Sequence, residues 1–357
     1  MKSNYDILGN HIRLIDTRNR ESITDRVLGI NIDKFFMPSV ANVIGTDLSK
    51  YKLITKGKFA CNPMHVGRDE RLPVALYDEE KPAIVSPAYF MFEVIDNSIL
   101  NEDYLMMWFR RPEFDRICWL HTDGSVRGGI TWDDICRLEL PIPPIENQLE
   151  IVNSYKAITE RIALKQKIND NLDDTAQTLY QKYFESNSDK SSWKQGTVGD
   201  VLQLQRGHDL PRTEMTGGKY PVAGSTGTIG YHDEFTAEAP VIVMGRSGNI
   251  GNPRLYLCNC WTHNTSLYVK QIYKAEPLWV FYLLKNVNYD SFVGGSAVPT
   301  LNRNDVHAYG ITIPPLELQK SFSQKVMSLI YCKEENLSEI EKLQELQKII
   351  LTTMSSR

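Results

Sequence analysis

The chain has 357 residues, enough for two or three domains, and its 42% hydrophobic and 24% charged content are those of an ordinary globular protein. The net charge of −4 excludes a chain that is basic throughout, so any nucleic-acid surface must be local or completed by a partner. No apolar run approaches the ~18 residues of a membrane span, no N-terminal stretch has the pattern of a signal peptide, and the irregularly spaced cysteines favour a reduced, cytoplasmic protein.

The first segment, residues 1–142, is expected to be a globular domain. Short strand-like runs occupy 51–94, with a turn signal at Lys56-Gly57, and EDYLMMWFRR at 102–111 predicts a helix. Basic and acidic residues are balanced in this segment, 18 against 21. The pattern is that of an α+β domain with small sheets.

Residues 140–148, LPIPPIENQ, mark the end of this domain. The two prolines suit a strand that ends and a helix that begins, because proline in the first helical turn loses no hydrogen bond. The stretch 143–184 then has apolar residues alternately four and three apart, without an internal proline or glycine, which is the heptad period of a coiled coil. The predicted seam of this first long helix includes Ile151, Tyr155, Ile158, Ile162, Asn169, Leu172 and Leu179.

A polar linker at 185–192 leads to a second globular segment at 193–313. Strand-like runs broken by glycine turns and a predicted helix at 277–286 make this segment α+β as well, with 10 basic and 9 acidic residues. Residues 311–319, ITIPPLELQ, repeat the boundary turn. A second long helix is expected at 314–357.

The second helix repeats the first with a shift of 171 residues, from 140 to 311. The match extends upstream without a gap, to Asp134-Ile135 against Asp305-Val306. The heptad pattern is repeated too. Its predicted seam includes Val326, Leu329, Asn336, Ile340, Leu343 and Ile350.

The lengths of the helices indicate how they pair. Each helix of about 40 residues would be ~60 Å long, whereas the second globular segment should be ~35 Å across. Because this segment joins the end of the first helix to the start of the second, helices that pair along their length must run antiparallel. The predicted fold is α+β: two globular domains with small sheets, held apart by a long antiparallel two-helix coiled coil with pseudo-twofold symmetry. The alternative is two amphipathic helices in separate globular cores.

Catalytic motifs are scarce. The sequence contains no G-x-x-x-x-G-K-[ST] phosphate loop, no H-E-x-x-H zinc helix and no methyl-transfer motif. Cys258, Cys260 and His263 could supply three metal ligands, but no fourth ligand is evident and C-x-C is unusual spacing for structural zinc. We therefore expect no catalytic residues and no metal site in this chain.

The order of motifs resembles the specificity (S) subunits of type I restriction–modification systems over essentially the whole length. The repeated IPP(I/L)ExQ turn is similar to that family's domain boundary. Further motifs resemble its recognition domains: KGKFACNP (56–63), IVSPAYFMF (84–92), KYPVAGSTGTIGYHD (219–233), GRSGNIG (245–251) and WTHNTSLYV (261–269). The resemblance implies target-recognition domains at 1–142 and 193–313, a linker at 185–192, and spacer helices at 143–184 and 314–357.

This resemblance implies a non-catalytic subunit that recognises DNA. Each domain would read one half of a bipartite, asymmetric site in double-stranded DNA, and the helices would set the distance between the halves. The helices would also dock two adenine methyltransferase (M) subunits, and motor–nuclease (R) subunits would join for restriction. The chain itself would bind no cofactor, whereas S-adenosylmethionine, ATP and Mg are implied for the partner subunits.

The residues that contact DNA should be polar and lie on loops. Arg, Lys, Asn, Gln, Ser and Thr read base edges, while Arg, Lys, Tyr and the N–H groups of glycine turns bind phosphates. In the first domain these criteria select Arg18, Arg20, Asn62, His65, Arg68, Ser125 and Arg127. In the second domain they select Arg206, His208, Lys219, Ser225, Thr226, Tyr231, Arg246, Ser247, Asn249, His263, Asn264 and Thr265. For each residue the alternative is an ordinary solvated side chain.

Two other functions stay open at this point. One is a coiled-coil scaffold that joins two protein- or ligand-binding domains without DNA. The other is a similar specificity subunit in a differently organised restriction system or one that only methylates.

Overall fold

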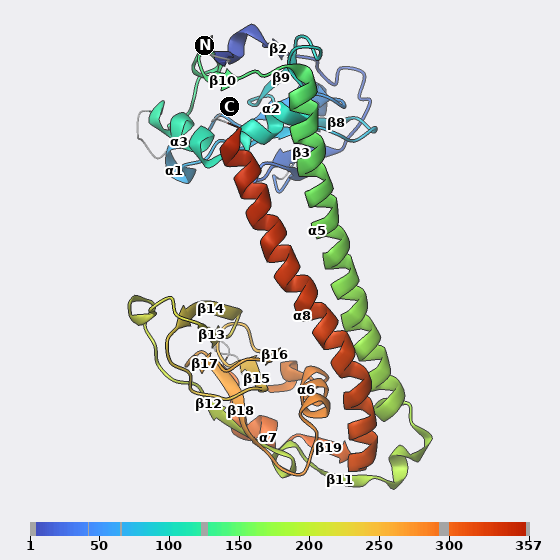
Figure 1. Ribbon diagram of the computed structural model, residues 1–357. Helices are drawn as coiled ribbons and strands as arrows, with labels where there is room; N and C mark the ends of the chain where they lie inside the picture. The colour runs from blue at the N-terminus through green and yellow to red at the C-terminus, as the bar shows by residue number, and fades with distance from the viewer. Residues whose placement is uncertain (1–4, 42, 65, 123–127, 293–299, 355–357) are drawn as a thin grey trace. The chain divides into compact units, whose positions relative to one another are not determined.

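The computed structural model describes residues 5–41, 43–64, 66–122, 128–292 and 300–354. The chain divides into two compact units, unit 1 (Met1–Leu164 with Glu339–Arg357) and unit 2 (Lys165–Ser338). Each unit contains one globular domain and parts of two long helices, α5 (Ile145–Tyr180) and α8 (Leu316–Thr353) (Figure 1). Among the described helices, none is long and apolar enough to cross a membrane.

Unit 1 is built on two four-stranded sheets. The first is antiparallel, in the order β2 (Ile12–Ile15), β9 (Phe90–Val94), β6 (Phe59–Cys61), β7 (Val74–Leu76). The second has the order β4 (Phe36–Pro38), β3 (Val27–Ile30), β8 (Ala83–Val85), β5 (Lys52–Ile54). Because successive side chains of a strand point to opposite faces, Phe59 and Phe92 enter one buried cluster, whereas Ala60 and Met91 enter another.

The described helices of this domain surround the first cluster. They are α1 (Val66–Asp69), α2 (Glu102–Phe109), α3 (Pro112–Leu120) and α4 (Trp132–Cys136). Helix α2 confirms the helix predicted from the EDYLMMWFRR run. Its residues from Tyr104 to Phe109 are all buried. The side chain of Asn101 caps this helix by accepting a hydrogen bond from the Tyr104 amide at 3.0 Å.

Unit 2 has a four-stranded and a three-stranded sheet. The four-stranded sheet is antiparallel, in the order β12 (Leu202–Arg206), β18 (Ser266–Ile272), β15 (Val241–Gly245), β16 (Gly251–Tyr256). The three-stranded sheet has the order β14 (Gly227–His232), β13 (Tyr220–Gly224), β17 (Trp261–Thr262). Two helices complete the domain, α6 (Pro277–Lys285), which confirms the helix predicted at 277–286, and α7 (Arg303–His307).

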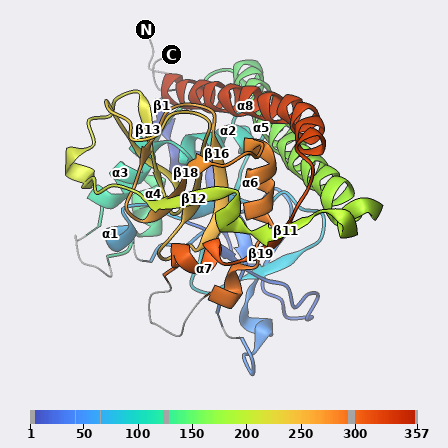
Figure 2. The same cartoon turned by 90° about the horizontal axis from the view of Figure 1, so that it is seen from below.

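The two domains share a frame that joins each of them to its long helix. In unit 1, β1 (Tyr5–Ile7) pairs antiparallel with β10 (Glu139–Pro141). In unit 2, β11 (Lys194–Thr197) pairs in the same way with β19 (Gly310–Ile313), and Figure 2 shows these two strands. A 3₁₀ turn follows the first strand of each pair, and its first amide is bonded to the residue just before β10 or β19. These bonds are Leu8 N to Leu138 O (2.7 Å) and Val198 N to Tyr309 O (3.0 Å).

Close packing of glycine is repeated within this frame. A Cβ at Gly9 would lie 2.9 Å from the Cβ of Cys136, and one at Gly199 would lie 3.3 Å from the carbonyl oxygen of His307. Positions 136 and 307 are themselves related by the shift of 171 residues. The matching glycines in the sequence therefore mark matching contacts in the structure.

The glutamine of each boundary motif is buried and joins the domain to the helix. The side chain of Gln148 accepts a hydrogen bond from Asn101 N (2.9 Å) and donates to the carbonyls of Ile99 and Pro143, both at 2.8 Å. In unit 2, Gln319 accepts from Glu276 N (2.9 Å) and donates to Pro314 O (2.9 Å). Asn101 and Glu276 are the N-cap residues of α2 and α6. These bonds give a physical reason for the repetition of the motif.

The second proline of each motif stands just before the helix, not inside its first turn as the sequence suggested. Helices α5 and α8 begin one residue later, at Ile145 and Leu316. The carbonyl of Pro144 accepts from the amides of Asn147 (3.0 Å) and Gln148 (3.2 Å). This proline therefore supplies the first carbonyl acceptor of the helix.

Within each unit the two long helices pack against each other and run antiparallel. In unit 1, Arg161 Nε lies 2.7 Å from Glu339 Oε1 and Gln347 Nε2 lies 2.7 Å from Thr159 Oγ1, so rising numbers on α5 meet falling numbers on α8. In unit 2, Asn336 bonds to Asn169 and Lys333 Nζ lies 2.5 Å from Asp173 Oδ2, so the helices run antiparallel there as well. The predicted fold class, α+β with small sheets and a long antiparallel helix pair, is confirmed.

The predicted seam coincides with the side chains that these helices bury. All the seam residues inferred from the heptad pattern on α5 and α8 are buried or half-buried. Asn169 and Asn336 are buried and joined by a hydrogen bond of 2.9 Å, and Lys165 Nζ donates to Asn336 Oδ1 at 2.9 Å. The polar positions of the seam thus satisfy one another.

Candidate nucleic-acid interface

One end of the four-stranded sheet of unit 2 gathers most of the residues selected from the sequence. Strands β12 and β15 end there, at Arg206 and Gly245, and β18 begins there, at Ser266. The pairings Arg206 with Leu267 and Gly245 with Ser266 bring the three termini together. The loops that continue from this end carry polar side chains and glycines, as expected for a surface that contacts DNA.

Backbone hydrogen bonds join these loops into one surface. The amide of His208 donates to Thr262 O at 2.7 Å, and the amides of Arg246 and Ser247 donate to Thr265 O at 2.9 and 3.2 Å. The turn that follows β13 is attached through Ser225, whose amide donates to Thr265 Oγ1 at 3.3 Å. We call this surface the unit 2 reading loops, defined as residues 206–209, 225–226, 246–250 and 263–265.

Side-chain bonds fix some polar groups of the reading loops and leave others at the surface. Asn249 Nδ2 donates to Ser225 O at 3.2 Å, and His263 Nδ1 lies 2.9 Å from Thr265 Oγ1. The amide of Asn264 bonds to the carboxylate of Asp209. Arg206 Nε donates to Asn264 O at 3.4 Å, and the side chains of Arg206 and His208 are exposed. This surface offers guanidinium, imidazole, amide and hydroxyl groups that can pair with base edges or phosphates.

Two glycines allow the loops to approach one another closely. A Cβ at Gly207 would lie 2.2 Å from the carbonyl oxygen of His263, and a Cβ at Gly245 would lie 1.5 Å from that of Asn249. Neither contact is possible for a residue with a side chain. The glycines of this region are therefore required by the packing of the loops.

Lys219 and Tyr231 are not part of this surface. They lie near the opposite end of the β13–β14 hairpin, where Tyr220 pairs with His232 and Pro221 pairs with Tyr231. The ammonium of Lys219 lies 4.8 Å from the centre of the Tyr220 ring. The sequence motif 219–233 thus spans a whole hairpin, and its two ends lie apart.

In unit 1, the matching end of the sheet β2-β9-β6-β7 carries the candidates Arg18 and Asn62. Strand β2 ends at Ile15 and β6 ends at Cys61, and both pair with the beginning of β9. Arg18 follows β2 and Asn62 follows β6. The same topological end of the same strand order is therefore selected in both domains.

Internal bonds occupy two of these first-domain candidates. Arg18 donates to Lys50 O at 2.7 Å and pairs with the carboxylate of Asp16 at 2.6 Å. This guanidinium holds the pKa of Asp16 below its usual range. Asn62 accepts from the amide of Met64 at 3.2 Å. The role of Arg18 in holding this loop together could not be predicted from its position in the sequence.

Arg20 is exposed on the loop after Arg18. His65, Ser125 and Arg127 lie outside the described residues, as does the side chain of Arg68. The predictions for these four residues have no structural counterpart here.

The structure adds basic and amide side chains that the sequence analysis missed. Lys50 is exposed beside Arg18, and Lys52 Nζ donates to Tyr89 O at 2.6 Å. In unit 2, Asn252 donates to Asn249 Oδ1 at 2.8 Å, and the guanidinium of Arg254 lies against Gly227, where a Cβ would be 2.2 Å from Nη1. The sequence analysis did not select Arg254, because this residue stands within a strand pattern and not in a loop.

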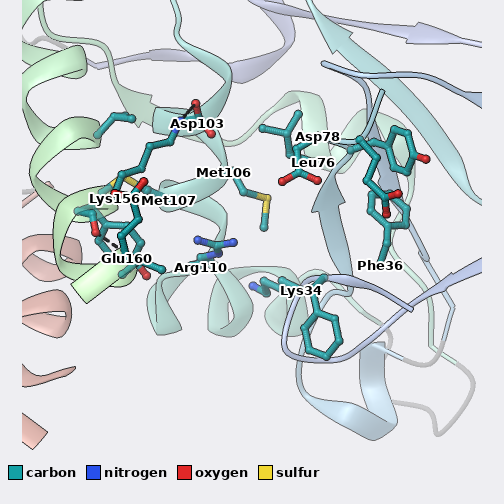
Figure 3. Close-up of a pocket in the computed structure, with 16 residues that line it drawn as sticks. Lys34, Phe36, Leu76, Asp78, Asp103, Met106, Met107, Arg110, Lys156 and Glu160 are labelled. Carbon is teal, nitrogen blue, oxygen red and sulfur yellow. Dashed lines mark hydrogen bonds and ion pairs between the residues drawn. The ribbon is translucent and has the colours of Figure 1, made fainter. Parts of the chain in front are cut away.

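A cavity of about 500 Å³ in unit 1 lies away from this sheet end, among α2, the start of α5 and strands β4 and β7 (Figure 3). Its wall mixes charges: Lys156 pairs with Asp103 at 2.6 Å, and Lys34 donates to Asp115 at 2.7 Å. Burial lowers the pKa of Lys34.

Among the described residues no group of three or more His, Cys, Asp or Glu side chains could hold a metal ion, at Cys258 and Cys260 or elsewhere.

Comparison with known proteins shows which proteins this chain is similar to. Residues 190–349 match the family model described as type I restriction modification DNA specificity domain. The chain is 22% identical to the putative type I restriction enzyme MjaX specificity subunit of Methanocaldococcus jannaschii, over 98% of this chain and 88% of that protein.

Solved structures share the fold. The S subunit of a type I restriction–modification system from M. genitalium matches with a TM-score of 0.62 at 18% identity, over 99% of this chain and 96% of the other. A chain from a structural study of complex assembly and conformational transition of the type I R-M system matches with a TM-score of 0.50 at 16% identity, over 98% and 96%.

The resemblance inferred from the sequence is thereby confirmed: residues 190–349 match the type I DNA specificity domain, and nearly the whole chain is similar to a type I specificity subunit. These subunits recognise the DNA sequence for a restriction–modification complex and are not themselves catalytic.

Proposed function

We propose that each domain of this chain reads one half of a bipartite, asymmetric site in double-stranded DNA. The observation that carries this proposal is the shared sheet end. Sheets β2-β9-β6-β7 and β12-β18-β15-β16 have the same strand order, and their matching ends lead into loops of different sequence. A common frame with different loops is what two unlike half-sites require.

The unit 2 reading loops support direct readout of bases. Arg246 lies on a turn fixed by its own backbone, since its amide donates to Thr265 O (2.9 Å) and its carbonyl accepts from Leu301 N (2.8 Å). A guanidinium on a fixed turn can form two hydrogen bonds to guanine. Neighbouring glycine N–H groups and hydroxyls are suited to phosphate contacts.

The long helices are proposed to dock the other subunits. Large apolar side chains are exposed along them, among them Leu164 (59%), Tyr331 (56%), Leu346 (48%) and Ile349 (50%). Leu346 and Ile349 stand three residues apart on α8 and so share one face of that helix. Contiguous exposed apolar surface marks protein contacts. Two adenine methyltransferase subunits would bind there, bringing S-adenosylmethionine, and motor–nuclease subunits would bring ATP and Mg for restriction. This chain would bind none of these cofactors.

The helices are also proposed to set the spacing of the two half-sites. One added heptad lengthens a helix by ~10.5 Å, close to the length of 3 base pairs at ~3.4 Å each. Heptads inserted together near Asn169 and Ile340 should therefore lengthen the unread spacer by about 1–3 base pairs, because the helices need not lie parallel to the duplex. Both half-sites should stay unchanged.

Modified-base sequencing of cells that carry this chain and its partner subunits tests the proposal. The expected result is adenine methylation at one asymmetric site made of two short half-sites and a spacer of fixed length. An active complex whose methylated sites lack two separated halves would contradict the proposal. A gel shift without sequence-specific binding, with and without methyltransferase subunits, would favour a protein scaffold instead.

A further inference from the structure

Unit 1 has an open cavity at the junction of its domain with the helix pair. It measures about 350 Å³ and lies between the start of α5 and the end of α8. Tyr104, Ile151, Ile350 and Met354 supply apolar wall, and Glu150 carries the one charge among the described residues that line it. We call this cavity the junction socket.

The internal repeat identifies the counterparts of its walls in unit 2. The shift of 171 residues relates Ile151 to Phe322 and Met354 to Tyr183. Tyr104 stands three residues after Asn101, as Trp279 stands three residues after Glu276, and these two N-caps are bonded to matching glutamines. The wall of the junction socket thus has a known equivalent.

In unit 2 the equivalent space is filled by an aromatic ring. The ring centre of Phe184 lies 5.1 Å from that of Phe322, 5.9 Å from Tyr183 and 6.4 Å from Trp279. Trp193 closes the group, with its ring centre 6.4 Å from that of Phe184. Phe184 is 3% exposed.

The sequence of unit 1 has no ring to offer at the matching positions. The shift of 171 residues relates Phe184 to Ser355, and the alignment of Gly199 with Gly9 relates Trp193 to Ser3. Both serines lie outside the described residues. Whatever their positions, a serine side chain cannot replace a phenylalanine or tryptophan in volume or apolar surface.

We propose that an aromatic side chain of a partner subunit fills the junction socket, in the way that Phe184 fills its counterpart. The inference rests on the function proposed above, and we assign the occupant to the methyltransferase subunit, whose docking surface on α5 and α8 continues to this junction. Glu150, which replaces the neutral Ser321 of unit 2, favours a cationic residue next to that aromatic side chain.

Filling the socket from within the chain tests the proposal. Ser154 lines the cavity and is exposed, and its hydroxyl donates to Glu150 O at 2.9 Å. In Ser154→Phe a ring would occupy the socket. Ser154→Ala loses the same hydrogen bond but leaves the socket open, and is the matched control. The full chain is titrated with its purified methyltransferase subunit, and binding is measured by sedimentation.

Ser154→Phe is expected to weaken this binding by about tenfold or more, as for the loss of an aromatic anchor, whereas Ser154→Ala binds like the wild type. Glu150→Gln should weaken binding less, and mainly at low salt. Normal binding by Ser154→Phe would overturn the junction socket alone. A wild-type chain that does not bind the methyltransferase subunit would overturn the proposed function as well.

A second measurement needs no partner. With methyl-¹³C-labelled methionine, added indole should shift the Met354 resonance in the wild type, because Met354 lines the socket, and should not do so in Ser154→Phe. Failure of indole to shift Met354 in the folded wild-type chain would overturn the claim that the socket accepts an aromatic ring.

Discussion

The two domains are alike where they join their helices and different where their loops face outward. At the join, Leu138 and Tyr309 accept equivalent backbone bonds, and Gln148 and Gln319 make equivalent side-chain bonds. At the opposite end of the sheet the loops have little in common: the turn after β2 is fixed by Arg18, whereas the turn after β12 depends on Gly207.

This difference shows which part of the chain is constrained by the fold. The join must present a long helix in a fixed way, and buried hydrogen bonds make it intolerant of change. The outer loops need only be held at the ends of the strands, so their sequences can differ between the domains. The same chain can therefore combine one scaffold with two recognition surfaces.

The largest expected effect comes from a change that damages only the loops of unit 2. In Gly207→Ala the new Cβ would meet the His263 carbonyl oxygen at 2.2 Å, so β12 and the 263–265 turn must separate. Because several base contacts would be lost together, specific DNA binding should fall by about tenfold or more. Methylation mapping should show a relaxed second half-site and an unchanged first half-site.

Gly310→Ala is the control for this change, since a Cβ at Gly310 meets nothing within 4 Å. It should leave both half-sites intact. Loss of the first half-site in the Gly207→Ala chain would show that the two domains do not read independently.

The join should be sensitive to substitution in both units, and more so in unit 1. In Gln148→Glu the carboxylate can still accept from Asn101 N, but its second oxygen would face the carbonyls of Ile99 and Pro143. A buried carboxylate oxygen that faces two carbonyls and has no donor should lower the free energy of unfolding by on the order of 1–3 kcal/mol. Gln319→Glu should cost less, because its amide donates to one carbonyl, Pro314 O, in place of two.

Denaturant unfolding of both variants measures this effect, with Gln166→Glu, at an exposed position of α5, as the control. Variants as stable as the control would show that the boundary glutamines do not hold the domains to their helices.

A smaller, local effect is expected from Arg246→Ala. The turn is held by backbone bonds to Thr265 and Leu301, so the fold should be unaffected. Loss of a guanine contact would cost roughly 1–3 kcal/mol of binding and relax specificity at one base pair of the second half-site. Binding assays on a panel of single-base variants measure this. Equal weakening on every sequence would instead assign Arg246 to a phosphate.

The smallest expected effect is a pH dependence confined to unit 2. His307 Nε2 accepts a hydrogen bond from Leu204 N at 2.8 Å, which requires an uncharged ring, and burial followed by the nearby Arg303 lowers its pKa. A histidine pKa below the unfolded value of ~6.5 favours the folded state at higher pH, and this stability is lost as pH falls below about 6.5.

The protection factor of the Leu204 amide, which compares its exchange rate with the intrinsic rate at the same pH, should therefore fall between about pH 7 and pH 5. Unit 1 has Cys136 at the position that matches His307, so it serves as the internal comparison. Equal behaviour of the two units would assign no such role to His307.

Much of the fold could be predicted from the sequence because its signals are local. The heptad pattern around Asn169 and Asn336 and the repeated double prolines need only neighbouring residues to be recognised. The bonds of Gln148 to Ile99 and Asn101, by contrast, connect positions far apart in the chain. Such contacts depend on tertiary packing, which no local pattern encodes.

The candidate interface was predicted only in part, because local sequence signals mark its turns but not the contacts that those turns make. The glycine-rich motifs selected turns that the structure brings together at one sheet end of unit 2. The motif at 219–233 also included Lys219 and Tyr231. These two residues lie at the end of the β13–β14 hairpin opposite its turn, away from the unit 2 reading loops. Arg18 met the chemical criteria for a DNA contact, but its bonds to Asp16 and Lys50 are visible only in three dimensions.

The central claim is that one frame presents two independent recognition surfaces, and an exchange of loops tests it most directly. The unit 2 reading loops would be replaced by those of another specificity subunit, with the frame, α5 and α8 left unchanged. Modified-base sequencing of cells with this chain and its partners should then show a new second half-site, while the first half-site and the spacer length stay the same. An active complex with an unchanged second half-site, or with both halves altered, would contradict the account.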